Sequence, residues 1–421
     1  MFMLFLFLFL CTTLISATEL VAPNSGSSFG HAVSVFGDWS VVGDPFSVAG
    51  RAFVFKRISN TWELITTLGH VDVSFGDEFG YSVSVGTEYI VVSAPNQFNQ
   101  GRVYVYRYFE EEWKLSSVLA PPLSYQYGRF GETVSIEGDV RIAVGHPGAD
   151  FMLNMGAGLV NVYHLVGWGS WYLTNSIHPT GDVIPYSNFG SHVVVADGNR
   201  ILISAPFHNQ GLVYLFKLDD HIWHLERTLE GDGDDSFGRF IGMSDSNIVV
   251  ASNSKVFTFF DYGERVSVID KNVYAMTVSK NLLILSTNQV IHTYTFSHGK
   301  WYLVEQIFDE KTYSALSVHN TTLIMGETYS NRVTSISEYY FTAVPTSSPS
   351  ISPTNSPLVP TTSMPSASPT NAPTNEKIEI SNNLLLGIFI PLSVLSLVCT
   401  GFCFYFQGNK EKIKEILKPH I

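Results

Sequence analysis

The chain has 421 residues, of which 37 are acidic and 24 are basic, so its formal net charge at neutral pH is −13. Such a charge leaves no basic surface for nucleic acid, and we expect no nucleic-acid partner. The three cysteines, Cys11, Cys399 and Cys403, lie near the two ends. A secreted domain of this size buries enough core to do without disulfides, so cysteine usage does not favour the cytosol.

Residues 1–17 are predicted to form a secretory signal peptide. Phe2 to Leu10 form an uninterrupted apolar run, and the small residue Ala17 offers a position for cleavage. The positive residue usual near the start is missing, and Ile15 would be the third residue before the cut, so the cleavage site stays open. The alternative interpretation is a buried hydrophobic strand.

The body of the chain repeats one pattern of four short strands. In its clearest copy, Phe79 to Leu115, β-branched and aromatic residues alternate with the two-residue period of a strand, and glycine or proline marks the turns. The third strand recurs seven times, starting near residues 50, 101, 158, 211, 255, 290 and 332. The fourth strand carries a tryptophan at the same position in five copies: Trp62, Trp113, Trp171, Trp223 and Trp301. A meander of about 40 to 50 residues is the size of one propeller blade, so we predict an all-β, seven-bladed β-propeller over residues 18–344.

Two short motifs accompany the strands. Phe-Gly opens five copies, at Phe29, Phe79, Phe130, Phe189 and Phe237, and a Gly/Ser-x-Pro motif ends the second strand in four, at Pro45, Pro95, Pro147 and Pro206. Together they resemble the FG-GAP repeat of the integrin α-subunit head and of other surface proteins. The resemblance covers residues 24 to 340; it is strong in four copies, partial in the fifth and weak in the last two. It implies a seven-bladed propeller that serves adhesion or ligand recognition.

The segment just after the predicted signal peptide has a predicted place in the ring. The last copy has no clear Trp-x-Leu strand, while Leu20 to Pro23 resembles Val118 to Pro121, the end of an outer strand. We therefore predict that residues 18–23 supply the outer strand of the seventh blade. This pairing would close the ring and leave no long open edge.

Acidic turns raise the question of calcium. Closely spaced carboxylates in Gly76 to Glu78 and Gly231 to Asp235 favour hard cations, but we interpret both turns as exposed connections between blades. Metal-binding members of the resembled family carry a D-x-D-x-D-G loop between the first two strands of a blade. The corresponding turns here are too short, so the family's calcium role is not carried over, and we expect no metal and no cofactor.

No motif in the body indicates catalysis, and we expect no enzyme and no catalytic residue. His221 and His224 flank Trp223 on a strand and are expected to face solvent. Propeller enzymes gather catalytic groups from many blades, so charged side chains converging at one mouth of the channel would favour an enzyme. A mouth lined by neutral residues would favour recognition.

One modification site is predicted in the body. Asn320-Thr321-Thr322 is the only N-x-S/T sequon of the chain, and it falls in a predicted tight turn, which makes Asn320 a glycosylation candidate. The alternative is a chance occurrence.

The C-terminal part changes composition. Residues 345–376, rich in Pro, Ser and Thr, are expected to form an extended, O-glycosylated stalk reaching on the order of 90 Å. Residues 384–406 carry no charge over 23 positions and suffice as a transmembrane helix. Lysines follow at once, so the tail, residues 407–421, is expected in the cytoplasm and the propeller outside. Cys403, near the inner boundary, is a palmitoylation candidate.

These predictions describe a single-pass type I membrane protein. Its propeller, extracellular or lumenal, would mediate adhesion or recognition of an extracellular protein or glycan ligand. Two alternatives stay open: a membrane-tethered hydrolase or carbohydrate-active enzyme with its site in the central channel, and a structural coat protein without a specific ligand.

Overall fold

The computed structural model describes residues 16–22, 28–123, 127–167, 169–181, 183–196, 198–233, 236–327 and 332–337. These ranges belong to the first of two compact units, residues 1–347; the second unit is residues 348–421. Most of the predicted signal peptide lies outside the described residues, as do the predicted stalk, the predicted transmembrane segment and the predicted tail. Within those residues, no helix is long and apolar enough to span a membrane.

The described strands form seven antiparallel sheets of four strands each. Blade 1 contains β2 (Ala32–Phe36), β3 (Trp39–Asp44), β4 (Arg51–Ile58) and β5 (Thr61–Leu68). Blade 2 contains β6 (Val83–Val85), β7 (Tyr89–Ala94), β8 (Arg102–Phe109) and β9 (Glu112–Leu119), with the short 3-10 helix η1 (Gln97–Asn99) between β7 and β8. Blade 3 contains β10 (Val134–Glu137), β11 (Arg141–His146), β12 (Leu159–Val166) and β13 (Ser170–Ile177).

The remaining four blades follow the same order. Blade 4 contains β14 (Val193–Ala196), β15 (Arg200–Ala205), β16 (Leu212–Asp219) and β17 (Ile222–Glu230). Blade 5 contains β18 (Phe240–Ser244), β19 (Asn247–Ala251), β20 (Lys255–Phe260) and β21 (Glu264–Asp270). Blade 6 contains β22 (Ala275–Ser279), β23 (Leu282–Thr287), β24 (Val290–Ser297) and β25 (Lys300–Phe308). Blade 7 contains β26 (Ala315–His319), β27 (Thr322–Glu327), β28 (Arg332–Ser337) and β1 (Ser16–Leu20).

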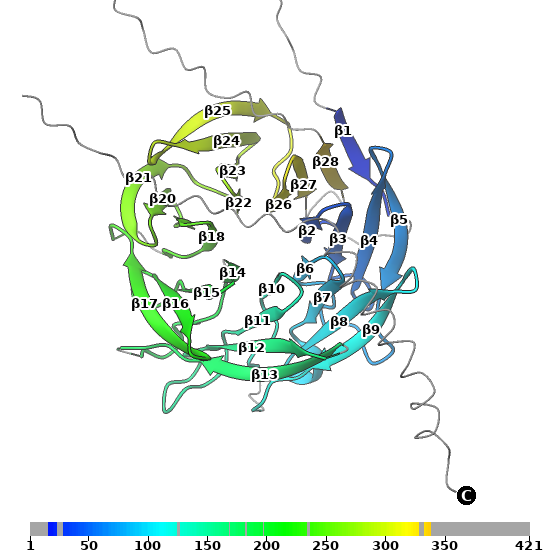
Figure 1. Ribbon diagram of the computed structural model, residues 1–421, viewed down its shortest axis with the longest axis horizontal. Coiled ribbons are helices and arrows are strands. Elements are labelled where there is room, and N and C mark those ends of the chain that lie inside the picture. Colours follow the sequence, from blue (N-terminus) through cyan, green and yellow to red (C-terminus); the bar gives the residue numbers. More distant parts are fainter. Residues whose placement is uncertain are drawn as a thin grey trace, which may run out of the picture. The chain divides into compact units, whose positions relative to one another are not determined.

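The blades stand side by side around a ring, with the first strand of each blade nearest the centre and the fourth at the outside (Figure 1). Each innermost strand contacts the innermost strand of the next blade, and β26 contacts β2 where the ring closes. The predicted all-β, seven-bladed propeller is confirmed.

The ring is closed by the N-terminal strand. β1 pairs antiparallel with β28, from Ser16 opposite Ser337 to Leu20 opposite Val333. The prediction that an N-terminal segment supplies the outer strand of blade 7 is confirmed, but the strand spans Ser16–Leu20 rather than residues 18–23. The strand begins within the predicted signal peptide, because Ser16 and Ala17 take part in the pairing. Leu20 is buried, and the Thr18 and Ser335 hydroxyls lie 2.6 Å apart.

The hydrophobic core lies between blades rather than within them. A single sheet has no second layer, so each blade must bury its apolar faces against its two neighbours. Seven buried clusters result, one at each interface between adjacent blades. In the first, Val41 and Val54 of blade 1 pack with Phe79 and Ile90 of blade 2. The repeat therefore gains its stability from stacking.

The repeated tryptophan has a defined partner in this stacking. In blades 2, 3 and 4 it lies on the outer strand and packs against the first residue of the second strand in the preceding blade. The Trp113 ring centroid is 5.1 Å from that of Trp39, and the Trp171 centroid is 5.3 Å from that of Tyr89. In the next interface, the guanidinium of Arg141 lies 5.4 Å from the Trp223 ring. The repeated tryptophan thus links successive blades at the outer side of the ring.

Near the centre, serine hydroxyls link the innermost strands. Ser34 accepts a hydrogen bond of 3.1 Å from the Val85 N–H of the next blade, and Ser317 of blade 7 accepts one of 3.0 Å from the Val35 N–H of blade 1. Ser84 and Ser135 make the same contact with the blades that follow them. These bonds satisfy backbone donors on an edge that no further strand covers.

Candidate functional site

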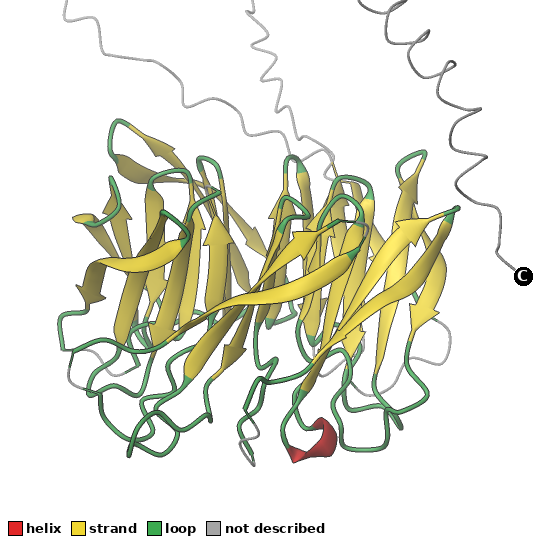
Figure 2. Cartoon of the chain, turned by 60° about the horizontal axis from the view of Figure 1, so that its bottom comes forward, coloured by secondary structure: helices red, strands yellow, loops and turns green. Residues whose placement is uncertain are grey.

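The two faces of the ring differ in their connections. In an antiparallel blade, the connection between strands two and three and the connection to the next blade lie at the same end. We call this end the loop face; its connections include residues 45–50, 69–82, 95–101, 120–133, 147–158 and 178–192. The opposite face carries tight turns such as the one between β2 and β3. Figure 2 shows the longer loops, and η1 among them, gathered at one face.

A cavity of about 750 Å³ opens at the loop face. We call it the central mouth, because its lining residues include those that directly precede the innermost strands of six blades: His31, Ser82, Thr133, His192, Arg239 and Ser314. A volume of this size is typical of binding sites for small ligands or for terminal groups of larger ones. The central mouth is therefore the candidate site.

The Phe-Gly motif builds the lining of the central mouth. In all five copies the phenylalanine is buried, and the glycine that follows has a φ between 93° and 96°. The residue after the glycine donates its N–H to the carbonyl oxygen of the residue before the phenylalanine, at 3.0 to 3.1 Å. This is a β-turn with its left-handed position held by glycine. The two residues that flank Phe-Gly are thereby placed at the ring's inner edge.

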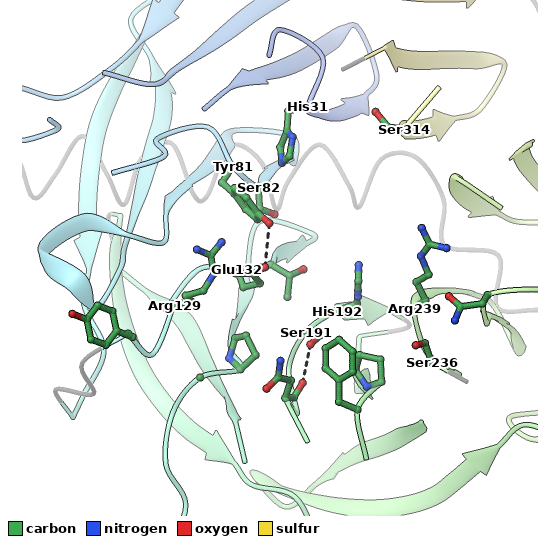
Figure 3. A pocket seen from close by; sticks show the side chains of 18 residues that line it. His31, Tyr81, Ser82, Arg129, Glu132, Ser191, His192, Ser236, Arg239 and Ser314 are labelled. Carbon is green, nitrogen blue, oxygen red and sulfur yellow. Dashed lines mark hydrogen bonds and ion pairs between the residues drawn. The ribbon is translucent and has the colours of Figure 1, made fainter. Parts of the chain in front are cut away.

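Four of these flanking residues form a charged cluster between blades 2 and 3. Arg129 donates to Glu78 at 3.3 Å, and it is also hydrogen-bonded to Glu132. The Tyr81 hydroxyl donates to Glu132 at 3.2 Å, and the guanidinium of Arg129 lies 5.0 Å from the Tyr81 ring (Figure 3). Outside this set, Arg129 also donates to the Asn96 side chain at 2.8 Å. The cluster has two carboxylates for one guanidinium and is acidic when both are ionised.

For Glu78 and Arg129 in this cluster, burial and the neighbouring charges shift the pKa in opposite directions. Burial raises the pKa of Glu78, although the Arg129 charge opposes this rise. Burial would lower the pKa of Arg129, but the carboxylates of Glu132 and Glu78 outweigh it and raise that pKa. Burial and the neighbouring Glu132 charge raise the pKa of Tyr81 to about 12, so the phenol keeps its proton and remains a hydrogen-bond donor.

Two histidines line the central mouth in a neutral state. Burial lowers the pKa of His31, and burial together with the Arg239 charge lowers the pKa of His192 to about 4. The His31 ring lies 4.9 Å from the Tyr81 ring and 5.2 Å from that of Phe46. At neutral pH both imidazoles therefore act as aromatic walls and neutral hydrogen-bonding groups.

Arg239 brings a positive charge to another side of the central mouth. It follows the Phe-Gly of blade 5, and its guanidinium lies 5.3 Å from the Phe240 ring. Among the described residues, no carboxylate forms an ion pair with Arg239. Figure 3 shows it well apart from Arg129, Glu132 and Tyr81. The central mouth thus has an acidic wall at blades 2 and 3 and a cationic wall at blade 5.

Exposed apolar side chains, which we call the rim, lie on the loop face together with the central mouth. The loop connections of blades 1–4 expose twelve large hydrophobic residues: Phe46, Val48, Val71, Phe75, Phe98, Leu123, Tyr127, Met152, Leu153, Met155, Tyr186 and Phe207. Leu153 is 98% exposed and Val71 is 94% exposed. Backbone hydrogen bonds between loops hold part of this rim in place, since the Tyr186 N–H donates to the Met155 carbonyl oxygen at 2.8 Å. Apolar exposure of this extent is typical of an interaction surface.

Of the predicted site residues, Asn320 lies within the described part of the chain, away from the central mouth. Asn320 is exposed, with a φ of 52°, in the turn between β26 and β27, as predicted; its glycosylation stays a prediction. Cys403 lies outside the described residues. His221 and His224 are both exposed, which confirms the prediction that they face solvent.

The two acidic turns differ from each other. The turn at Gly76 to Glu78 is more than an exposed connection, because Glu78 is only 17% exposed and pairs with Arg129. In the other turn, Asp232 pairs with Arg265, while Asp234 and Asp235 lie outside the described residues. Within the part of the chain that the structure describes, no group of three acidic, histidine or cysteine side chains is arranged to hold a metal ion.

Sequence analysis missed the residues of the central mouth, although their signal was present. Eight of the lining residues stand immediately before Phe or immediately after Gly in the Phe-Gly motif: His31, Tyr81, Arg129, Glu132, Asn188, Ser191, Ser236 and Arg239. The motif itself is constant, while these flanking residues differ from blade to blade. Variation beside an invariant turn is the pattern of a scaffold that presents a specific site.

The comparisons with known proteins agree with the fold. Residues 62–106 match the model of the FG-GAP repeat. The search of curated proteins gave no match. Among solved structures, the chain is similar to the crystal structure of Saccharomyces cerevisiae Sqt1, with 12% sequence identity, a TM-score of 0.51 and coverage of 76% of this chain and 99% of that chain. This identity supports a likeness of fold alone. The chain therefore carries an FG-GAP repeat within a seven-bladed β-propeller, an arrangement consistent with the propeller of integrin α subunits.

Proposed function

We propose that this protein is a surface receptor whose propeller mediates adhesion or ligand recognition through its loop face. The observation that carries the proposal is the coincidence of two features on the loop face: the central mouth of about 750 Å³ and the rim of exposed apolar residues. FG-GAP propellers in general fit a ligand-binding role. An extracellular protein or glycan is the proposed ligand.

The proposed location rests on the sequence. We propose that residues 1–17 direct the chain into the secretory pathway, that residues 384–406 anchor it as a single-pass type I protein, and that residues 345–376 act as a stalk. The loop face would then meet its ligand outside the cell or in a lumen. Protease treatment of intact cells tests this topology, with the full chain carrying one tag within residues 345–376 and one at the C-terminus. Loss of the tag within residues 345–376 alone is expected, whereas protection of both tags would contradict the proposal.

The recognition test compares the two faces of the ring. The full chain, purified and immobilised on beads, is incubated with a panel of cell surfaces and glycans. Binding is expected, and replacing the exposed rim residues Met152 and Leu153 with serine is expected to reduce it at least fivefold. Phe109→Ser, at the opposite face and 53% exposed, is the matched control. Binding no stronger than that of an unrelated immobilised protein would leave the structural coat protein as the better interpretation.

One observation favours the alternative of a tethered hydrolase. Charged side chains do converge at the central mouth, and Glu132 accepts a hydrogen bond from Tyr81 while contacting Arg129. Against catalysis, both carboxylates of the cluster are paired with the same guanidinium, which holds them as a structural unit. Hydrolysis of a panel of chromogenic glycosides by the full chain, abolished in Glu132→Gln, would overturn the proposal that the protein is not an enzyme.

A further inference from the structure

The strongest unexplained feature of the central mouth is the difference between its two arginines. Arg129 has three hydrogen-bonding side chains, those of Glu78, Glu132 and Asn96. Arg239 is partly buried against Phe240 and has no ion-pair partner within the described part of the chain. A guanidinium presents a rigid fork of donors that matches an oxyanion, and its partial burial strengthens that attraction. Arg239 is thus arranged to receive an anionic group from a ligand.

The surroundings of Arg239 favour a carboxylate on a polar ligand. Ser191, Ser236 and Asn253 line the same cavity and offer neutral hydrogen-bonding groups. His192 lies in the same wall, and its Nδ1 atom is buried without a partner among the described residues. The neutral imidazole adds no second positive charge, so this wall matches a single negative charge rather than a phosphate of higher charge.

The opposite wall fixes the other end of the ligand. Glu132 and Glu78 together outweigh the charge of Arg129, so a second anionic group would be repelled there. A carboxylate has acceptor sites beyond those used by one tyrosine and one arginine, and hydroxyl groups suit them. Tyr81, Tyr127 and Phe207 also line the cavity and give it aromatic surface. An Asp or Glu side chain of a protein would match Arg239 but leave these hydroxyl-binding groups unmatched.

We propose that the central mouth binds the acidic sugar of a glycan, with the sugar carboxylate on Arg239 and the sugar hydroxyls on the wall formed by Glu132 and its neighbours. The proposal rests on the proposed function, since it names the ligand class of the same face. The cavity volume of about 750 Å³ accommodates one or two sugar units. The apolar rim would then contact the carrier of the glycan.

The test measures the affinity of the purified full chain for single sugars. The probes are glucuronate and N-acetylneuraminate, the uncharged counterparts glucose and N-acetylmannosamine, and a short peptide containing aspartate. We expect each acidic sugar to bind at least tenfold more tightly than its uncharged counterpart and than the peptide. Arg239→Ala is expected to remove this preference, because it deletes the charge-assisted hydrogen bonds. Arg239→Lys keeps the positive charge but loses the forked donors of the guanidinium. This variant is expected to keep only part of the preference for acidic sugars.

Arg107→Ala is the matched control. Arg107 pairs with Glu88 at the opposite face, so the same change of charge is expected to leave sugar binding unaltered. Thermal melting checks the fold, and if Arg239→Ala melts early, Arg239→Gln replaces it.

Equal binding of acidic and uncharged sugars, or an acidic-sugar preference that survives Arg239→Ala, would overturn the proposal. Preference for the peptide would assign the site to a protein ligand instead. If no probe binds while the beads still bind cell surfaces, the sugar proposal fails and the receptor proposal stands.

Discussion

Blades 1–5 and blades 6 and 7 share the same four strands but differ where those strands meet the central mouth. In blades 1–5, Phe-Gly forms a turn, and the residue after glycine is presented at the cavity. In blades 6 and 7, Val273 and Tyr313 take the place of phenylalanine, and Tyr274 and Ser314 take the place of glycine. Val273 and Tyr313 are as buried as the phenylalanines they replace. Blades 6 and 7 therefore keep a buried side chain at the position of the phenylalanine but lack the Phe-Gly turn.

The glycine that precedes the third strand of a blade is also replaced in some blades. The glycine before the third strand lies against the phenylalanine of the next blade: a Cβ on Gly101 would be 2.0 Å from the Phe130 carbonyl oxygen, and a Cβ on Gly158 would be 2.1 Å from that of Phe189. Blades 5 and 6 precede the blades without Phe-Gly, and they carry Ser254 and Gln289 at this position. The two losses coincide at these two interfaces, whereas blade 7 also lacks the glycine, with Asn331 at that position, although blade 1 keeps Phe-Gly.

The largest expected effect concerns the closure of blade 7. Deleting residues 16–20 removes the whole outer strand β1 and the buried Leu20, and we expect a loss comparable with the total folding free energy of about 5–15 kcal/mol. The melting temperature measured by circular dichroism should fall sharply. Val21→Ser, at a neighbouring position that is 69% exposed, should melt like the wild type. An unchanged melt of the deletion would mean that blade 7 is stable with three strands.

The next effect tests the paired glycines directly. Gly101→Ala forces a Cβ against the Phe130 backbone at a φ of 100°, and it should destabilise the fold by about 3 kcal/mol. Gln289→Ala, at the same position in blade 6, should change stability by less than about 0.5 kcal/mol, because Gln289 is exposed. Urea unfolding measures both. Equal costs would show that the two classes of blade do not differ in this contact.

A smaller effect depends on pH. Burial lowers the pKa of both His146 and His192 to about 4, from the ordinary value of 6.5. The unfolded chain therefore binds these protons more tightly than the folded chain. Their contribution to stability is complete above pH 6.5 and is lost as the pH falls toward 4, by up to about 3 kcal/mol for each histidine. Unfolding of wild type and His192→Gln should be compared at pH 7 and pH 4.5. The acid loss should be smaller in the variant; an identical loss would contradict the pKa assignment.

The smallest effect is expected at Asn320. Its side chain is exposed in a turn of blade 7, so Asn320→Gln should leave the melting temperature unchanged. Expression in a host that glycosylates asparagine should give a heavier wild-type protein, and the variant should lack the extra mass. A wild-type mass without any N-linked glycan would show that the sequon is a chance occurrence.

The seven-bladed ring could be predicted from the sequence better than the central mouth, because a repeated residue pattern indicates repeated strands and repeated contacts between blades. Phe-Gly and the outer-strand tryptophan recur since each makes the same contact at successive interfaces, as Trp113 does with Trp39. The N-terminal strand was also predictable, since one outer strand was missing from the repeats. The central mouth was not, because Glu78, Arg129 and Glu132 follow no repeated residue type. Their proximity depends on the turn geometry and on two blades lying side by side, which a linear pattern does not contain.

The pairing of β1 with β28 has a consequence for how the molecule is made. Thr18 and Ser335 are 317 positions apart in the chain, yet their hydroxyls meet. The ribosome synthesises β1 long before it synthesises β28. Blades 1–6 can therefore stack during synthesis while the apolar residues of β1 stay uncovered. Completion of the ring is a late, long-range event with a high entropic barrier. During this interval the unpaired edge of blade 7 and the uncovered apolar residues of β1 make the chain most prone to aggregation.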